Sequence, residues 1–556
     1  MKKYIALFLA LVMIFALCAC GGKTDTPKTD TPKTDAPKAD TPKANTPKTD
    51  TPATTPEPPK ENEQITLRIG IDGFVGDLNM AGAEQECRSA TFGVFDLLFF
   101  PDPKTREWTS NVLTEWHREE DDKGKWMVLT MRDDIYFSNG DHATSEDLLY
   151  SYTSFVDRDM AGWLNEAKVI PGDSYIRDEY TIALKVDDFV EGFYNRVFPL
   201  QDKKWCVEAN WDAEKWYYPV GSGPYYVADH KPNESYVLKL RDDYWLRPAS
   251  DFYINEYIIT KYADTATAYM ALEIGDIDIC RVAKTEFTRL QQDGPAAGLG
   301  NTLIPTGVTT NLYMPGHLEP AWQNKLVREA VAVGVNWEEL DQLVYGSLYK
   351  VAKSITPSDS PVFYDAGGYE FNPERAKELL AEAGYQPGEL LLKTCLFESE
   401  PYKTWGQGFA YYLSEIGIET DITYADNVTV FAWWASGDTA FSMHDNIGGS
   451  PSRNPISSIN IALGTGAPYG LIEDEHFQEL YKKLDSMFEA PLAERKPVAE
   501  ELQKYIHDEI LIIPMHEDVV AYGFNEKILS ADLLGGYIFG AGDIRTDRLG
   551  LRENWG

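Results

Sequence analysis

The stretch Pro219-Val220-Gly221-Ser222-Gly223-Pro224-Tyr225-Tyr226 decides how the fold of this 556-residue chain is interpreted. Its two glycines permit backbone angles that other residues resist, and its two prolines fix theirs. The alternating segment Tyr236-Val237-Leu238-Lys239-Leu240 follows and predicts a strand. We therefore interpret the stretch as a stiff crossover from one folding unit into another, and as part of a hinge between lobes. An ordinary loop is the alternative.

The length and the charge of the chain limit its class. With 556 residues it exceeds what one hydrophobic core usually supports, so we expect two or three domains. Its 51 basic and 88 acidic residues give a net charge of −37. This charge argues against nucleic-acid binding, because a phosphate backbone attracts lysine and arginine.

The N-terminus has the features of a processing signal. Lys2 and Lys3 precede an apolar run, Tyr4 to Leu17, that is too short to span a bilayer comfortably. The next residues, Leu17-Cys18-Ala19-Cys20-Gly21-Gly22, resemble the bacterial lipoprotein signal, in which cleavage precedes a cysteine that carries lipid. Cys20 fits best, since small Ala19 stands before it. Residues 1–19 are thus predicted to be a lipoprotein signal peptide, and a plain secretory peptide is the alternative.

Residues 20–63 are predicted to be a lipid-anchored, disordered tether rich in Thr, Pro, Lys and Asp. The motif Thr-Asp-Thr-Pro-Lys recurs as Thr24 to Lys28 and Thr29 to Lys33. Few apolar residues are present, so burial cannot offset the entropy of ordering. Regular proline favours an extended geometry of ~3 Å per residue, which gives a reach on the order of 100 Å. Such a tether predicts a folded domain held away from the outer face of the cytoplasmic membrane.

Local patterns predict several elements of the folded part. Alternation predicts strands at Ile65 to Ile71, and at Val112 to Arg118 paired with Trp126 to Arg132. Capping residues predict helices that open at Thr144 to Asp147 and at Asn372-Pro373. Apolar spacing predicts a helix over Lys325 to Leu340, and a short apolar run predicts a strand over Asp508 to Pro514.

A longer segment carries a family resemblance. Leu129 to Asp147, which includes Arg132-Asp133-Asp134 and Phe137-Ser138-Asn139-Gly140, resembles the signature of bacterial solute-binding protein family 5. These are the extracytoplasmic peptide-binding proteins of ABC importers. Further stretches agree with the family in the same order along the chain: Gly221 to Tyr225, Arg241 to Trp245, Ala271 to Asp278, Val327 to Val331, and Asn372 to Leu380 with Ala383 to Tyr385.

The resemblance implies an α/β, bilobal periplasmic-binding-protein-like fold of the class with an extra inserted domain, in which a hinge joins two mixed α/β lobes. Lobe I would comprise residues 64–106, 220–306 and 522–556, with 107–219 as its inserted domain. Lobe II would comprise residues 307–521. The ligand would be enclosed between the lobes by hinge closure, and a peptide would bind through its backbone as an added strand.

The resemblance also suggests where a ligand binds. Phe441 to His444 is predicted as a strand, and the loop from Asp445 to Pro455 would line the cleft. In relatives an aspartate of this loop pairs with the free amino end of a peptide, but the matching position here is Pro451. Asp445 could substitute for it, and Arg453 could pair with a carboxylate instead. The candidate ligand-binding residues, which include three tryptophans that suit a binding cleft, are Trp405, Trp433, Trp434, Asp445, Asn446, Gly449, Ser450 and Arg453.

Enzyme motifs are missing from the sequence. It contains no Gly-x-Ser-x-Gly, no phosphate-binding loop and no His-Glu-x-x-His, so neither catalytic residues nor a cofactor is predicted. His507 and His516 make a weak case for a metal, and no metal site is predicted. Four cysteines remain after the signal, and both disulfide pairing and free buried thiols stay open: Cys87, Cys206, Cys280 and Cys395.

The leading hypothesis is therefore a monomeric, lipid-anchored peptide-binding component of an ABC importer, with permease and ATPase subunits as partners. One alternative is the same scaffold with a non-peptide ligand, such as an oligosaccharide or a metal chelate. Another is a signalling receptor or a wall-associated folding helper without transport.

Overall fold

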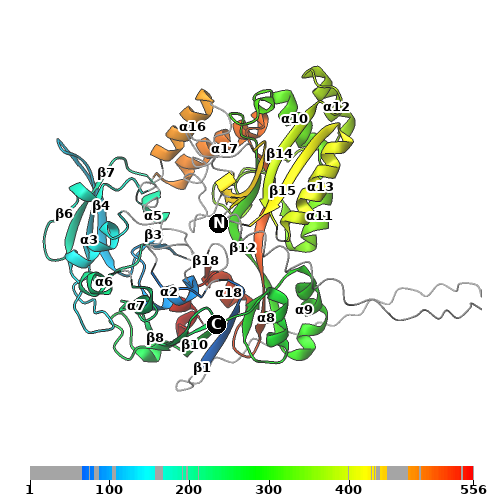
Figure 1. Ribbon diagram of the computed structural model, residues 1–556. Helices are drawn as coiled ribbons and strands as arrows, with labels where there is room; N and C mark the ends of the chain where they lie inside the picture. Colours follow the sequence, from blue (N-terminus) through cyan, green and yellow to red (C-terminus); the bar gives the residue numbers. More distant parts are fainter. Residues whose placement is uncertain are drawn as a thin grey trace, which may run out of the picture. The chain divides into compact units, whose positions relative to one another are not determined.

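A computed structural model gives the architecture of the chain (Figure 1). The chain divides into two compact units, Met1–Thr54 and Thr55–Gly556, and every element below belongs to the second. The structure describes residues 65–73, 75–79, 87–102, 108–156, 164, 167–190, 192–195, 198–210, 212–398, 400–426, 429–430, 432–433, 439–447, 474–487, 490–539 and 543–554.

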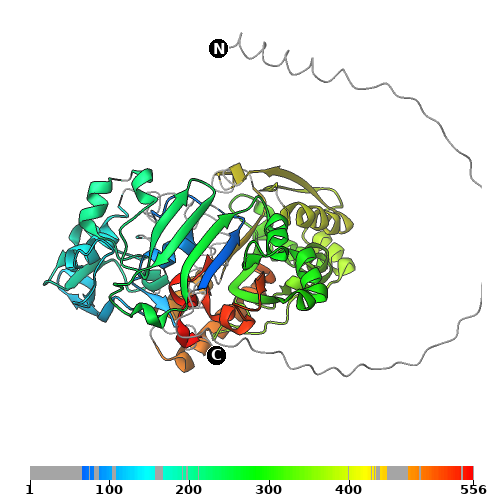
Figure 2. The same ribbon diagram turned by 90° about the horizontal axis from the view of Figure 1, so that it is seen from below.

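A nine-stranded sheet runs through the described part of the chain. Its order is β16-β12-β17-β11-β1-β10-β9-β8, and β13 pairs with β17 outside this path. Strand β1 is parallel to both β10 and β11, and in Figure 2 blue β1 lies beside the green strands that follow it. The strand bounds are β1 Ile65–Ile71, β8 Tyr225–Lys231, β9 Ser235–Leu240, β10 Ile254–Lys261, β11 Ile279–Arg281, β12 Leu299–Tyr313, β13 Lys350–Val351, β16 Ser442–Ile447 and β17 Ile513–Asn525.

We use lobe I for the half of the sheet that contains β1 and β8 to β11, together with the helices packed on it. These helices are α2 Arg88–Val94, α8 Thr265–Glu273, α9 Lys284–Ala297, α18 Ala531–Tyr537 and α19 Thr546–Leu549, and the hairpin β18 Ile538–Phe539 with β19 Asp543–Ile544 lies near the chain's end. Its main core includes Leu67, Ile69, Tyr257 and Phe524.

A second, four-stranded antiparallel sheet of order β4-β5-β7-β6 belongs to the segment inserted between α2 and β8. It has a core of its own, which includes Leu129, Phe137 and Tyr152. The remaining pair of short strands here is β2 Phe100–Pro101 with β3 Trp108–Thr109. The element bounds are β4 Leu113–Asp121, β5 Gly124–Met131, α3 Ser145–Thr153, β6 Tyr175–Ile176, β7 Thr181–Val186, α5 Gly192–Asn195, α6 Lys203–Ala209 and α7 Ala213–Trp216.

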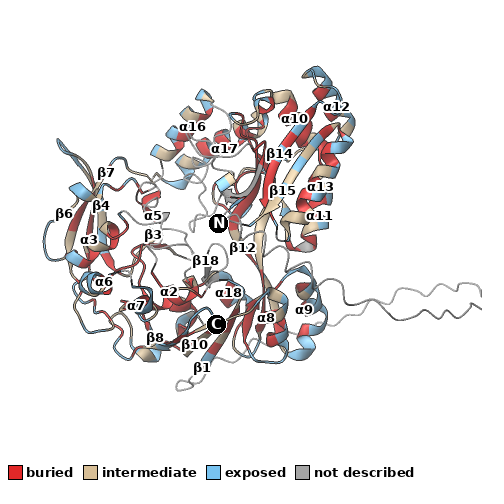
Figure 3. Cartoon of the chain, in the orientation of Figure 1, coloured by how far each residue is buried: buried red, intermediate tan, exposed pale blue. Residues whose placement is uncertain are grey.

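Lobe II is the group of elements between Thr309 and Glu517. Helices surround a parallel pair of strands and the upper halves of β12 and β17, and Figure 3 shows buried residues in red along β12. The largest core includes Trp322, Val331, Leu392 and Phe409. The bounds are α10 Lys325–Gly334, α11 Trp337–Val344, α12 Pro373–Glu382, β14 Leu390–Phe397, α13 Tyr402–Glu415, β15 Ile418–Ala425, α16 Glu475–Ser486 and α17 Leu492–Glu509.

Strands β12 and β17 connect the two lobes. Their antiparallel register is continuous from Leu299↔Asn525 to Pro305↔Val519, then shifts and resumes at Thr309↔Glu517. Thr306, Gly307 and Val308 therefore lie opposite the single residue Asp518, and Gly307 has a φ of +78°, which glycine adopts without strain. We use the word hinge for this bulge, because it lies where both strands pass from one lobe to the other.

The stretch from Pro219 to Tyr226 is a crossover, but it does not lie at the hinge between the lobes as we interpreted it from the sequence. The stretch leads from the inserted segment into β8, and it is bound tightly within lobe I: Gly223 N donates to Val94 O at 2.8 Å and Trp245 Nε1 donates to Ser222 O at 2.9 Å. Neither Gly221 nor Gly223 has a positive φ. Glycine is needed there because a Cβ on Gly221 would lie 2.0 Å from Val94 O.

Some of the other predictions of helices and strands are confirmed, and others are wrong. The strand at Ile65–Ile71, the hairpin β4–β5 and the capped starts of α3 and α12 are confirmed, and α3 has the full capping box at Thr144. The single helix over Lys325 to Leu340 is wrong, because the chain breaks between α10 and α11 at Val335, which is extended. The strand over Asp508 to Pro514 begins only at Ile513, since α17 continues to Glu509.

Candidate functional site

The direction of the strands shows which edge of lobe I faces the hinge. Strand β17 enters lobe I from lobe II, and β11 runs antiparallel to it with Arg281 opposite Tyr522. Since β1 is parallel to β11, the carboxyl ends of both strands point back toward lobe II. In α/β sheets, ligands bind at the carboxyl ends of parallel strands. Tyr522 is three residues from Val519 at the hinge, a separation of roughly 10 Å along a strand.

A small cavity of about 80 Å³ lies at this edge. The end of β1 lines it together with five polar or charged residues from different elements: Asp72, Arg88, Arg281, Tyr522 and Asp543. They come from the turn after β1, the start of α2, β11, β17 and β19. The hairpin β18–β19 is held there because Ser89 Oγ accepts a hydrogen bond from Ile544 N at 3.0 Å. Two guanidinium groups, one phenol and two carboxyl groups thus meet near the hinge.

The charges of this cavity are coupled. Burial works against the charged form of Arg281, but Tyr522 and Asp543 outweigh it and raise the pKa of the guanidinium above its ordinary value. Burial raises the pKa of Asp543, and the positive charges of Arg281 and Arg88 partly offset that effect. Burial likewise raises the pKa of Tyr522, which therefore stays a neutral phenol. The two guanidinium groups balance the two carboxyl groups in formal charge, but Asp72 is exposed to solvent, which screens its charge more than the charges of the half-buried groups.

On the lobe II side, edge strand β16 also runs toward the hinge. It pairs antiparallel with β12, from Ser442↔Tyr313 to Ile447↔Thr309, so its carboxyl end approaches the bulge. The predicted boundary between strand and loop was wrong here. Asp445 and Asn446 belong to β16 rather than to the loop that follows it, because the ladder with β12 continues to Ile447.

The predicted tryptophans differ in their placement. Trp405 is 1% exposed and stacks on Phe409 at 4.7 Å between ring centroids, so it is part of the lobe II core rather than an accessible surface. This placement corrects our expectation that Trp405 faces a ligand. Trp433 is partly buried and packs against the same core. Five predicted residues lie outside the described residues: Cys20, Trp434, Gly449, Ser450 and Arg453.

A buried polar cluster lies directly beside the hinge. The imidazole of His516, 3% exposed, is 3.4 Å from Asp341 Oδ1 through Nδ1 and 3.6 Å from Asp518 Oδ1 through Nε2. The rings of Tyr345 and Tyr349 flank it at 4.4 and 5.0 Å. The two carboxylates approach opposite nitrogens of the ring, so these groups do not converge on one point as metal ligands would.

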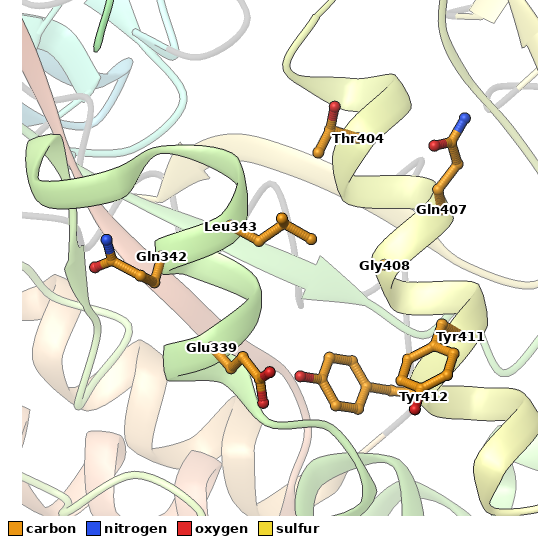
Figure 4. Close-up of a pocket in the computed structure, with 8 residues that line it drawn as sticks. All are labelled: Glu339, Gln342, Leu343, Thr404, Gln407, Gly408, Tyr411 and Tyr412. Atoms are coloured by element: carbon orange, nitrogen blue, oxygen red, sulfur yellow. The ribbon is translucent and has the colours of Figure 1, made fainter. Parts of the chain in front are cut away.

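Lobe II has a separate groove between α11 and α13, of about 640 Å³ (Figure 4). Glu339, Gln342 and Leu343 of α11 line one side, and Thr404 and Tyr411 are among the α13 residues on the other. Leu343 is 59% and Tyr411 60% exposed. The groove thus lies between two helices of lobe II.

Within the described ranges, no group of three or more His, Cys, Asp or Glu side chains is arranged to hold a metal ion. His507 instead lies 3.2 Å from Gly368 O and stacks on Tyr369. The four cysteines left open by the sequence are buried and form no disulfide among the described residues. No helix in the described part of the chain combines the length and the apolar character needed to span a bilayer.

Sequence reasoning missed the lobe I cavity. Its signals were weak but present: Asp72-Gly73 directly follows the buried strand Ile65–Ile71, and Arg281 directly follows buried Ile279 and Cys280. The partners Arg88 and Asp543 gave no local signal, because they reach the cavity only through the packing of α2 and β19 against the sheet.

Two α/β lobes joined by two long strands, with strand ends directed at the joint, define a solute-binding protein of the bilobal class. The model of bacterial extracellular solute-binding proteins, family 5, matches residues 107–467, and the chain belongs to this family. Members of this family are solute-binding proteins, so the chain is a binding protein and not an enzyme, as the sequence resemblance predicted.

The sequence identity to individual relatives is low. The chain is 26% identical to the nickel-binding periplasmic protein of Escherichia coli K12 over 49% of its own length and 52% of the relative's. It is 26% identical to the periplasmic murein peptide-binding protein MppA of the same organism, over 53% and 58% of the two chains. These alignments span little more than half of either relative.

Among solved structures, the fold resembles the periplasmic binding protein DppA of Helicobacter pylori in complex with the peptide STSA. The TM-score is 0.70 at 17% identity, covering 88% of this chain and 98% of that one. The likeness confirms the bilobal fold.

Proposed function

We propose that this chain is the lipid-anchored substrate-binding component of an ABC importer, and that it captures peptides between its lobes and delivers them to a membrane permease. The observation that carries the proposal is the convergence of strand ends from both lobes on the bulge in β12 and β17. A solute held at these ends contacts both halves, so hinge closure encloses it. Among the strands that the structure describes, β16 also stands at the edge of the sheet, a position at which an extended peptide can add as a further strand.

The experiment is mass spectrometry of the small molecules that remain bound through purification of the full chain. Peptides of mixed sequence support the proposal, because backbone recognition is insensitive to side chains. Recovery of only non-peptide solutes overturns it.

A second ligand class has its own support. The nickel-binding relative, together with Pro451 at the position where family members use an aspartate for the amino end of a peptide, favours a metal chelate. Metal analysis of the same purified sample separates the two classes, since only a chelate gives stoichiometric metal that leaves together with an organic ligand.

The anchor is a separate part of the proposal. Cys20 carries the lipid, and residues 20–63 tether residues 64–556 to the outer face of the membrane. The variant Cys20→Ser is expected to release the protein into the medium, whereas Cys18→Ser remains with the membrane fraction. Release of both variants, or of neither, contradicts the assignment of Cys20.

A further inference from the structure

The cavity at the carboxyl ends of β1 and β11 has a chemistry opposite to that of the protein as a whole. The chain carries a net charge of −37, yet Arg88 and Arg281 are brought together here. They face one half-buried carboxyl group, Asp543, and one exposed carboxyl group, Asp72. Solvent screens an exposed charge far more than a half-buried one. The interior of the cavity is therefore the part that favours an anion.

The size of the cavity restricts which anion fits. A cavity of about 80 Å³ has room for several water molecules but not for a whole peptide, so only a small end group of a solute can enter it. A carboxylate, with two oxygens in one plane, matches this space and the planar fork of a guanidinium. Both arginines already have partners inside the protein, but a guanidinium has five N–H donors and can bind a carboxylate beside them.

The surroundings hold these donors in place. Arg281 is fixed on β11 by the ladder with β17, where it pairs with Tyr522. Arg88 is the first residue of α2, and the buried residues of this helix pack it against lobe I. Asp543 lies on the hairpin β18–β19, and its negative charge acts on both arginines. The two donors thus come from two elements that are packed in lobe I, which reduces the reorganisation needed when an anion arrives.

We infer that this cavity is a subsite of lobe I that receives a carboxylate of the bound solute, with Arg88 and Arg281 as donors and Asp543 as the residue that positions them. The inference rests on the proposed function, because it places one end of the captured solute at the hinge edge of lobe I. For a peptide, the carboxylate is the carboxyl terminus or an acidic side chain.

The test uses the full chain and a random tetrapeptide library synthesised twice, with free carboxyl ends and with carboxamide ends. Peptides retained by the protein are counted by mass spectrometry. We expect at least tenfold better retention of the free acids, and we expect Arg88→Gln to remove most of that preference. Arg289→Gln is the matched control, since Arg289 is an exposed arginine of the same lobe that pairs with Glu273 at 2.8 Å. Equal retention of both libraries overturns the subsite while leaving peptide binding intact.

A second measurement decides the subsite if no peptide binds, in which case the proposed peptide function fails by itself. Acetate, compared with chloride at the same ionic strength, is expected to raise the melting temperature of the wild type and of Arg289→Gln but not of Arg88→Gln. Because Arg281 supports the fold, Arg281→Lys, which keeps the charge and loses the fork, is used in place of a neutral variant and should show a smaller acetate effect. The same acetate effect in Arg88→Gln and in the wild type overturns the inference.

Discussion

At the scale of single residues, Asp341 on α11 shows what burial beside the hinge does to a carboxyl group. The residue is 7% exposed, and Oδ1 accepts no hydrogen bond among the described residues. Burial raises its pKa to about 6, while His516 opposes the shift and Asp518 adds to it. Tyr345 and Tyr349 cover the same cluster, so water cannot replace the missing hydrogen bond easily.

This pKa predicts a pH-dependent cost to stability. The folded pKa lies above the ordinary value near 3.9, so the folded state keeps a proton that the unfolded chain releases between pH 4 and 6. Stability from this group is therefore highest below pH 4 and falls as pH rises to 6, by about 3 kcal/mol in all. We expect Asp341→Asn to be more stable than the wild type at pH 7, by up to that amount, and equally stable at pH 4. Urea unfolding at several pH values measures this difference.

The matched control is Glu378→Gln, since Glu378 is an exposed carboxylate that pairs with Arg375 on the surface of α12. Its difference from the wild type should stay small at each pH. A difference for Asp341→Asn that does not change with pH would show that Asp341 keeps an ordinary pKa.

Arg241 stabilises lobe I through N–H groups that donate to buried carbonyl oxygens. It is 3% exposed and donates to Gly223 O at 3.2 Å and to Phe137 O at 3.1 Å. Arg241→Met would remove the Arg241 donor from Gly223 O and leave Phe137 O with only Gly140 N, at 2.9 Å, as a donor. We expect a loss of about 3 kcal/mol in unfolding free energy. Arg375→Met removes only exposed ion pairs and should cost less than about 1 kcal/mol. Equal losses in the two variants would refute the role of the buried donors.

At the scale of elements, the stretch from Pro219 to Tyr226 fixes the inserted segment to lobe I by close backbone approach. Gly221→Ala would put a methyl group 2.0 Å from Val94 O. Helix α2 cannot move away from this methyl group without losing its own packing. We expect a loss of several kcal/mol, on the order of the largest single-residue effects, or failure to fold. Gly172→Ala is the control, because a Cβ there meets nothing within 4 Å. Thermal unfolding of both variants provides the comparison.

These elements also show what the sequence could predict. Capping residues and alternation act over a few positions, so α3, α12 and the hairpin β4–β5 could be predicted from the sequence. The break at Val335, the true start of β17 and the close approach at Gly221 depend on distant partners. The roles of Arg88 and Asp543 in the cavity could not be predicted either, since only tertiary packing brings α2 and β19 to one edge of the sheet. Trp405 was misjudged because a large aromatic suits a core as well as a cleft.

At the scale of the whole molecule, function depends on the two strands that join the lobes. The bulge in β12 places three residues opposite Asp518, and Gly307 at its centre has a φ of +78°. A residue with a Cβ is strained at such a φ by about 1 kcal/mol. Gly275, at the end of α8, has a φ of +79°, and a Cβ at that position would meet nothing within 4 Å, so its replacement causes the same strain away from the hinge.

We therefore expect Gly307→Ala and Gly275→Ala to lose similar stability, about 1 kcal/mol each, while only Gly307→Ala changes the coupling between ligand and closure. X-ray scattering of the full chain with and without the solute recovered from purification measures closure, and calorimetry measures affinity. Gly275→Ala should compact on binding as the wild type does, whereas Gly307→Ala should compact less and bind more weakly, although neither residue touches the proposed subsite. If both variants close and bind like the wild type, the bulge is not the hinge, and the motion must be sought in other segments between the lobes.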